Sequence, residues 1–125
     1  NKKDLKNIYF KDFDINLENK IKKYDILLHL SKREGLPVSV MQSLSAGLPV
    51  ICYDIRGNND LVKNKFNGFF VKSCGDVIKK INYLNLEDEY FNFMRINALK
   101  SIHNNFLKKQ INLNLYKIIK NYSKR

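Results

Sequence analysis

A short polar segment, residues 31–37, has the composition of a loop that binds an anion. It follows residues 25–30, an apolar run of strand length, and precedes a predicted helix. Pro37 suits the first turn of that helix, because proline lacks the N–H that has no partner there. Backbone N–H groups at a helix start attract phosphate or diphosphate, and a glycine lets the ligand approach closely. The residues predicted to bind it are Gly35, Leu36, Pro37 and Val38.

Two polar side chains flank this loop. Gln42 lies four residues after Val38, on the same helix face and about 7 Å along the axis, from where it could reach a ribose beside a diphosphate. Glu34 precedes the helix, where a carboxylate can accept hydrogen bonds from sugar hydroxyls. The ordinary alternative stays open, because acidic loop residues are commonly solvated and strand–loop–helix turns with a glycine are common.

The elements that would position these residues alternate along the chain. Strands are predicted at residues 8–10, 25–30, 49–53 and 68–71, and helices at residues 17–24, 38–46 and 57–62. Gly47 is expected to end the second helix. The unbroken apolar run at residues 25–30 is typical of a strand covered on both faces, so we expect it in the centre of the sheet. The order βαβαβαβ predicts an α/β fold, an open parallel sheet with flanking helices that binds ligands at the carboxyl ends of its strands.

The remainder of the chain has a helical pattern. Helices are predicted from residue 76 through residue 84 and at residues 87–103, followed by a last helix. The apolar face of that last helix contains Ile111, Leu115, Ile118, Ile119 and Tyr122, and its opposite face Lys117, Lys120 and Lys124. It either packs against the sheet or a neighbouring domain, or lies on a membrane surface. We expect one domain over residues 1–125, with a helical tail at about 76–125.

Composition limits the classes of function. A chain of 125 residues, 44% of them apolar, has the size of one packed domain. Its 23 basic and 12 acidic side chains give a net charge of +11, which would attract phosphates, nucleic acid or an anionic membrane, or would simply be a solvated lysine-rich surface.

Cysteine content and hydropathy give the expected setting. Cys52 and Cys74 have no metal-ligand spacing and indicate a reduced, cytoplasmic environment, and we predict no metal site. The sequence has no apolar run of about eighteen residues and no signal-peptide pattern, so we expect a soluble or peripheral protein. It begins with Asn1, and apolar residues follow almost at once, so we expect a cut amino end.

Four ordered segments carry a family resemblance. They are SKREGLP at residues 31–37, SLSAGLPV at 43–50, RGNNDLV at 56–62 and NGFFV at 67–71. Together they resemble the carboxyl-terminal domain of family 4 glycosyltransferases, in particular bacterial enzymes that build capsular or exopolysaccharide repeat units. The resemblance covers residues 8–71. It implies the second Rossmann-like domain of a GT-B fold, which binds the donor in a retaining, nucleotide-sugar-dependent reaction, with UDP as the expected nucleotide and neither a metal nor another cofactor required.

The resemblance also implies roles for particular residues. In the family's Glu-x7-Glu motif, the first Glu contacts the donor sugar and the second holds the ribose. Glu34 matches the first position and is the expected catalytic residue, whereas Gln42 at the second keeps an acceptor but lacks the charge. Leu30 replaces the proline that often precedes the motif's serine. The family's acceptor-binding amino-terminal domain is missing, so we expect this chain alone to be inactive.

Two other classes of function compete with this interpretation. One is a non-catalytic nucleotide-binding or interaction module that keeps the fold. The other is a basic nucleic-acid-binding domain, for which the sequence has no readout motif, so no nucleic acid is predicted. The expected partners are a nucleotide-sugar donor, a glycan or lipid-linked acceptor, the amino-terminal GT-B domain and, through the basic surface, the inner face of the membrane.

The remaining polar residues have ordinary expectations. His29 is expected to be a satisfied histidine of the core or the layer behind the site. Asp54 and Asp60 flank a glycine turn and are expected to serve in turn and cap interactions, with Asp60 as the cap. Lys32 and Arg33 either lean towards the diphosphate or point to solvent.

Overall fold

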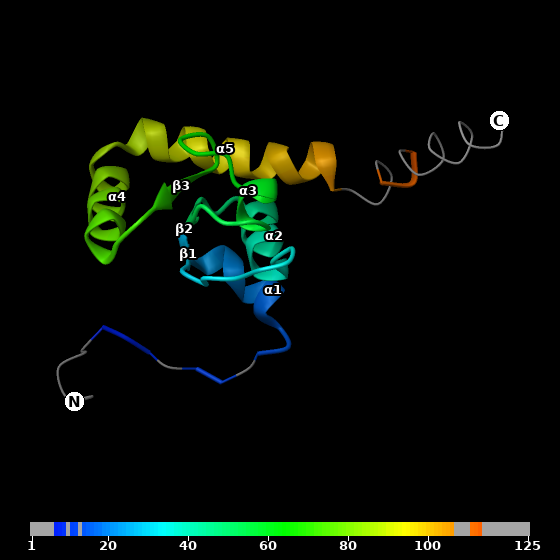
Figure 1. Cartoon of the computed structure of the whole chain (residues 1–125), viewed down its shortest axis with the longest axis horizontal. Coiled ribbons are helices and arrows are strands. Elements are labelled where there is room, and N and C mark those ends of the chain that lie inside the picture. Colours follow the sequence, from blue (N-terminus) through cyan, green and yellow to red (C-terminus); the bar gives the residue numbers. More distant parts are fainter. Residues whose placement is uncertain (1–6, 10, 13, 107–110, 114–125) are drawn as a thin grey trace.

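The computed structural model describes residues 7–9, 11–12, 14–106 and 111–113. These residues form a parallel sheet of three strands in the order β1-β2-β3, with helices on both faces (Figure 1). The strands are β1 (Leu27–His29), β2 (Val50–Tyr53) and β3 (Gly68–Val71). The helices are α1 (Leu17–Lys20), the 3-10 turn η2 (Ile21–Lys23), α2 (Val38–Ser45), α3 (Asn58–Leu61), α4 (Cys74–Leu86) and α5 (Asp88–Asn105). The predicted α/β class is confirmed.

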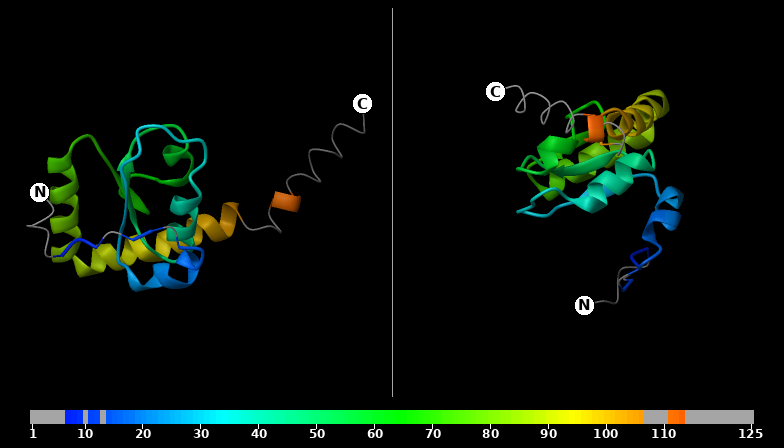
Figure 2. Two further views of the ribbon diagram at one scale, coloured as in Figure 1. Left: turned by 90° about the horizontal axis from the view of Figure 1, so that it is seen from below. Right: turned by 90° about the vertical axis from the view of Figure 1, so that its right-hand side faces the viewer.

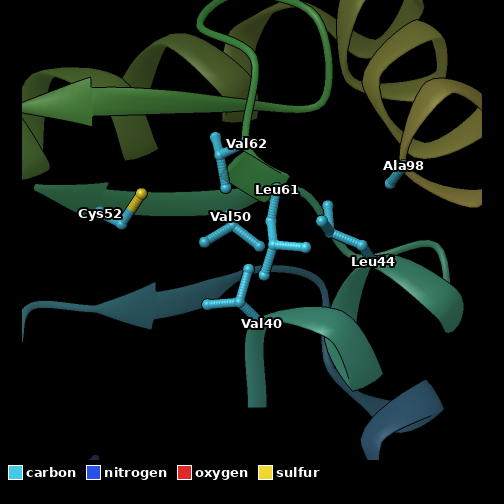
Figure 3. Close-up of a cluster of buried hydrophobic side chains, with 7 residues drawn as sticks. All are labelled: Val40, Leu44, Val50, Cys52, Leu61, Val62 and Ala98. Carbon is cyan, nitrogen blue, oxygen red and sulfur yellow. The ribbon is translucent and has the colours of Figure 1, made fainter. Parts of the chain in front are cut away.

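The central strand β2 separates two hydrophobic cores. Side chains alternate along a strand, so Val50 and Cys52 enter the core beneath α2, while Ile51 enters the core beneath α4. All three are fully buried. Figure 3 shows the first core, formed by Val40, Leu44, Val50, Cys52, Leu61, Val62 and Ala98.

Helix α5 joins the two cores. Met94 packs in the core beneath α4, and Ala98, one turn later, packs in the core beneath α2. In Figures 1 and 2 the helix runs across the sheet past both α4 and α2. Helix α5 thus contributes to both cores, and loops follow the carboxyl ends of the strands.

The prediction that residues 25–30 form the central strand is wrong. Within the described residues, β1 pairs only with β2 and lies at an edge of the sheet. Leu28 faces away from α2 and is 46% exposed, on the side of the sheet where α4 packs on β3. On that face Ile26 still packs against the core beneath α4, whereas Leu28 is left exposed, and the central place in the sheet belongs to β2.

The predicted strand at residues 8–10 is not formed by its described residues. Ile8 and Tyr9 lie in no strand, and Tyr9 is 81% exposed; Phe10 lies outside the described residues. The segment runs apart from the sheet in Figure 1, so its N–H and C=O groups have no strand beside them. The sheet of the described residues therefore has one strand fewer than predicted.

Helix boundaries follow the predictions closely, with two differences. The helix predicted at residues 17–24 divides into α1 and η2, in which Ile21 is buried. Pro37 is the N-cap of α2, one position before the first turn, because its ψ of 114° is extended. Gly47 does end α2, with a φ of 79°, and Leu48 N–H donates to the Ser43 carbonyl at 2.9 Å.

The predicted helical tail is described only in part. Helices α4 and α5 confirm the helices predicted from residues 76 and 87. Ile111 of the last predicted apolar face lies in a short helical stretch at residues 111–113. The rest of that face and its lysines lie outside the described residues. No helix in the described part of the chain is both long and apolar enough to cross a membrane.

Candidate functional site

The predicted site residues lie together at the carboxyl end of β1. The loop after His29 carries Glu34 and Gly35 and then enters α2. Gly35 and Leu36 are exposed, and Val38 is 60% exposed, so the outer surface of the loop is open. A Cβ placed on Gly35 would meet no atom within 4 Å. The backbone at Gly35 is therefore open to a ligand.

The amino terminus of α2 has unused hydrogen-bond donors. Its first intrahelical bond runs from Met41 N–H to the Pro37 carbonyl at 3.2 Å, so the N–H groups of the first three helical residues have no partner within the helix. No described side chain caps this end, and its first turn contains no acidic residue. In α4, by contrast, Ser73 Oγ accepts from Asp76 N–H at 3.2 Å. The start of α2 has the chemistry to bind an anion.

Gln42 lies one turn into α2, on the same side as Val38. Its side chain is half-buried and makes no hydrogen bond to another described residue. Its carbonyl is used within the helix end, where it accepts from Ser45 Oγ at 2.7 Å. The amide group is thus available to a ligand bound at the start of the helix.

Glu34 contacts His29, a residue that the sequence predicted to be a satisfied histidine outside the site. His29 Nε2 lies 3.1 Å from Glu34 Oε1, and the two side chains are 15% and 26% exposed. The two atoms are close, but Nε2 is buried and has no aligned hydrogen bond to any described residue. His29 is therefore part of the site's geometry. The available signal was its place as the last strand residue before the loop.

The backbone of Gly57 supports the Glu34 loop from the neighbouring strand end. Gly57 has a φ of 88°, and a Cβ there would overlap the Gly35 carbonyl oxygen and lie 3.4 Å from Glu34 Cβ. Gly57 is also the N-cap of α3, so the prediction of Asp60 as the cap is wrong. Asp60 lies inside the first turn, because the chain enters the helix directly from the glycine.

The other polar residues near the loop have simple roles. Asp54 accepts a long hydrogen bond from Asn59 Nδ2 at 3.4 Å, an interaction within the turn. Lys32 and Arg33 are exposed and, within the described residues, form no ion pair. Cys52, the register partner of His29, is buried, and this burial, with the charge of Asp54 second, raises the pKa of its thiol to about 12. Cys52, which is paired with His29 in the sheet, is therefore a neutral thiol.

Two further observations concern a groove elsewhere on the molecule and metal binding. A groove of about 330 Å³ lies at the other end of α2, away from the predicted residues. It is lined by Ser45, Leu99, Lys100, Ile102, His103 and Asn104. Within the described residues, no group of three or more His, Cys, Asp or Glu side chains is arranged to hold a metal ion.

The site lies at the carboxyl end of a strand in an open parallel sheet, where the next helix begins and can bind an anion. This arrangement is typical of a Rossmann-like nucleotide-binding domain. Comparison with known sequences gives the family. Residues 2–101 match the glycosyl transferases group 1, and the chain belongs to this family. It is 37% identical over 93 residues to a UDP-Gal:α-D-GlcNAc-diphosphoundecaprenol α-1,3-galactosyltransferase of Escherichia coli, an alignment that covers 73% of this chain and 24% of that protein.

Solved structures show the same fold. Anabaena HepE in complex with UDP-glucose superposes with a TM-score of 0.82 at 20% identity, over 94% of this chain and 33% of that one. The carboxyl-terminal domain of a glycosyl transferase group 1 family protein from Francisella tularensis gives 0.70 at 16% identity, over 81% and 53%. The fold is thus that of the carboxyl-terminal half of a GT-B enzyme. The chain spans about a quarter of the E. coli relative's length.

Proposed function

We propose that this chain is the donor-binding part of a retaining family 4 glycosyltransferase that uses a UDP-sugar. The observation that carries the proposal is the uncapped start of α2 beside Glu34, in a chain of this family. The diphosphate binds at Gly35, Leu36, Pro37 and Val38, through the backbone N–H groups of the loop and helix start other than the proline, which has none. Gln42 contacts the ribose, and Glu34, the catalytic residue, accepts hydrogen bonds from the donor sugar.

The chemistry that these groups supply is stabilisation of the leaving group. Breaking the bond between the sugar and the diphosphate places negative charge on the phosphate oxygens, and fixed N–H dipoles at a helix start lower the energy of that charge. Glu34 faces the sugar, on which positive charge develops. No metal or other cofactor is part of this proposal.

The acceptor is proposed to be a growing polysaccharide or a lipid-linked oligosaccharide. One relative is named for a sugar linked to diphosphoundecaprenol, which supports an acceptor of the second kind. Acceptor binding then requires the amino-terminal domain of a GT-B enzyme, since the chain matches only about a quarter of that relative. The enzyme is proposed to work in the cytoplasm, as part of capsule or exopolysaccharide synthesis.

Peripheral contact with the inner face of the membrane follows from the same acceptor. The basic face predicted for the last helix would attract anionic lipids. Neutralising Lys117, Lys120 and Lys124 is expected to reduce binding to vesicles that contain phosphatidylglycerol. Unchanged vesicle binding would count against this contact.

A second candidate function is a non-catalytic nucleotide-binding module with the same fold. The observation in its favour is Gln42, which lacks the negative charge of the motif's second carboxylate. Binding without turnover is expected of both candidates. Joining the chain to the amino-terminal GT-B domain of a family relative, and assaying sugar transfer, would separate them.

The donor site is tested by titrating the chain with UDP, UDP-glucose, UDP-galactose and UDP-N-acetylglucosamine. Binding is measured by calorimetry and by changes in amide chemical shifts. We expect shifts centred on residues 35–42. Glu34→Ala should weaken the binding of the sugar nucleotides and leave the affinity for UDP nearly unchanged, because the carboxylate faces the sugar. Glu89→Ala, at an exposed position on α5, is the matched control. Equal weakening of UDP, or shifts elsewhere, would remove Glu34 from the donor site.

A further inference from the structure

We propose that His29 is a positioning residue that holds the Glu34 carboxyl group at the carboxyl end of β1, with one oxygen against the imidazole and the other turned to the donor sugar. This inference rests on the proposed function, because that function assigns the donor sugar as the ligand of Glu34. It starts from the 3.1 Å contact between His29 Nε2 and Glu34 Oε1.

The backbone places His29 rigidly. It is the last residue of β1 and is paired in register with Cys52 of the fully buried part of β2. Leu27, two residues earlier, packs against the core beneath α2, so alternation puts the imidazole on the same face, directly before the loop. Glu34 itself sits on a loop. A side chain on a paired strand can therefore fix one on a loop whose own conformation is less constrained.

Partial burial favours the contact between His29 and Glu34. The two side chains are 15% and 26% exposed, so water screens their contact less than it would at the surface. Cys52 beside the ring is a neutral thiol, and Lys32 and Arg33 are exposed and form no ion pair within the described part of the chain. His29 is thus the one basic group, among the described residues, within ion-pair distance of Glu34.

The contact leaves the carboxyl group usable. Oε1 makes the 3.1 Å contact with the imidazole, and Glu34 makes no hydrogen bond to another described side chain. Gly57 lies on the side of the loop where Glu34 Cβ is. A Cβ added at Gly57 would be 3.4 Å from Glu34 Cβ. The imidazole thus contacts the carboxyl group, and Gly57 lies beside the Cβ of the same side chain. The Oε2 atom remains to accept from a sugar hydroxyl.

The experiment compares His29→Leu with His29→Gln in the chain, titrated with UDP and with the sugar nucleotide that the unaltered chain binds most tightly. His29→Leu should weaken the binding of the sugar nucleotide about three- to tenfold, which is the effect of losing one polar contact. The affinity for UDP should stay within about twofold of that of the unaltered chain. His29→Gln should recover most of the loss, because its amide can donate to Oε1. A merely structural role would not produce this sugar-specific difference or its rescue.

Two further measurements make the test decisive. In the Glu34→Ala background, His29→Leu should cause no additional weakening, because the group that it positions is gone. In carbon-13-labelled protein, the Glu34 carboxyl signal should move in His29→Leu even without nucleotide. An unmoved carboxyl signal, equal weakening of UDP and sugar nucleotide, or additive losses in the double variant would each overturn the positioning role.

The failure of the proposed function would look different. If the unaltered chain binds none of the nucleotides, the donor site and the sugar-directed part of the inference both fall. A carboxyl signal that still moves in His29→Leu would then leave only the contact between His29 and Glu34. Sugar-nucleotide binding that depends on Glu34 but not on His29 would overturn the inference alone.

Discussion

Gly57 lies directly against the backbone of Gly35, with no space for a side chain between the two loops. A Cβ at Gly57 would overlap the Gly35 carbonyl oxygen, and the φ of 88° is one that residues with a side chain rarely adopt. The turn that begins α3 and the loop that carries Glu34 therefore form a single unit at the carboxyl ends of β1 and β2.

Gly57→Ala should disturb both stability and the site. We expect a loss of about 3 kcal/mol in the free energy of unfolding, from the backbone conformation and the overlap with Gly35, measured by denaturant unfolding. Gly75→Ala is the matched control, since an added Cβ there meets only Ser73 Oγ at 3.7 Å and its φ is not positive. The control should stay within about 1 kcal/mol of the unaltered chain. Similar losses in both variants would refute the contact.

Gln42→Glu should strengthen UDP binding if Gln42 contacts the ribose. A carboxylate accepts hydrogen bonds more strongly than an amide, so we expect a gain of about three- to tenfold in affinity by calorimetry. Gln42→Ala should weaken UDP instead. If neither variant changes the affinity, the ribose lies elsewhere.

Asn67 should be among the costliest polar residues to remove. It is fully buried, its Nδ2 donates to the Leu61 carbonyl at 3.0 Å and to Ser101 Oγ at 3.1 Å, and its Oδ1 accepts from Lys63 N–H at 2.7 Å. Asn67→Ala removes these three hydrogen bonds, including the ones to the Leu61 carbonyl and the Lys63 N–H, and we expect a loss of about 3 kcal/mol in the free energy of unfolding. The exposed Asn59→Ala should cost less than about 0.5 kcal/mol. Equal costs would contradict this role.

The two cysteines should react at very different rates. Burial raises the pKa of the Cys52 thiol to about 12, so at about pH 8 it is almost entirely the unreactive thiol, whereas Cys74 is exposed. Mass spectrometry after brief iodoacetamide treatment should show Cys74 modified and Cys52 protected. In denaturant both should react. Rapid modification of Cys52 in the folded chain would mean that β2 is accessible.

Asp76 should make stability depend on pH at the acid end. The Lys72 N–H bond, followed by the bond with Ser73, lowers the pKa of this carboxyl below its ordinary 3.8. A lowered pKa means that the folded state favours the charged form, so this stabilisation is present above pH 3.8 and is lost as the pH falls through the folded pKa. The stability difference from Asp76→Asn should therefore shrink in acid. Ser73→Ala should move that change to higher pH; an unchanged profile would argue against the bond.

The sequence predicted the elements best where local chemistry determines them. Strand β3 has its predicted bounds, and α2 ends at Gly47, because a glycine with positive φ is a local requirement. The position of β1 in the sheet could not be predicted this way. An apolar run indicates burial, but which helix covers Leu28 depends on where α4 packs.

The candidate site was predicted in part for the same reason. Glu34, Gly35 and Gln42 follow one another along a strand–loop–helix segment, so their spacing alone brings them together. The contact of His29 with Glu34 depends on the path by which the loop folds back on its strand, and that of Gly57 with Gly35 on the packing of two loops. Neither path is encoded in a local pattern.

The two sides of the sheet differ in how they end. On β3, the turn before the strand blunts the outer edge, because Asn64 Oδ1 accepts from Phe70 N–H at 3.1 Å and Lys65 N–H donates to the Gly68 carbonyl at 2.8 Å. On β1, no described residue occupies the outer edge. A bare edge with Leu28 beside it is a template for a further strand, from the same polypeptide or from another copy. Where that edge stays open, β1 offers its backbone N–H and C=O groups for pairing between molecules in concentrated solution.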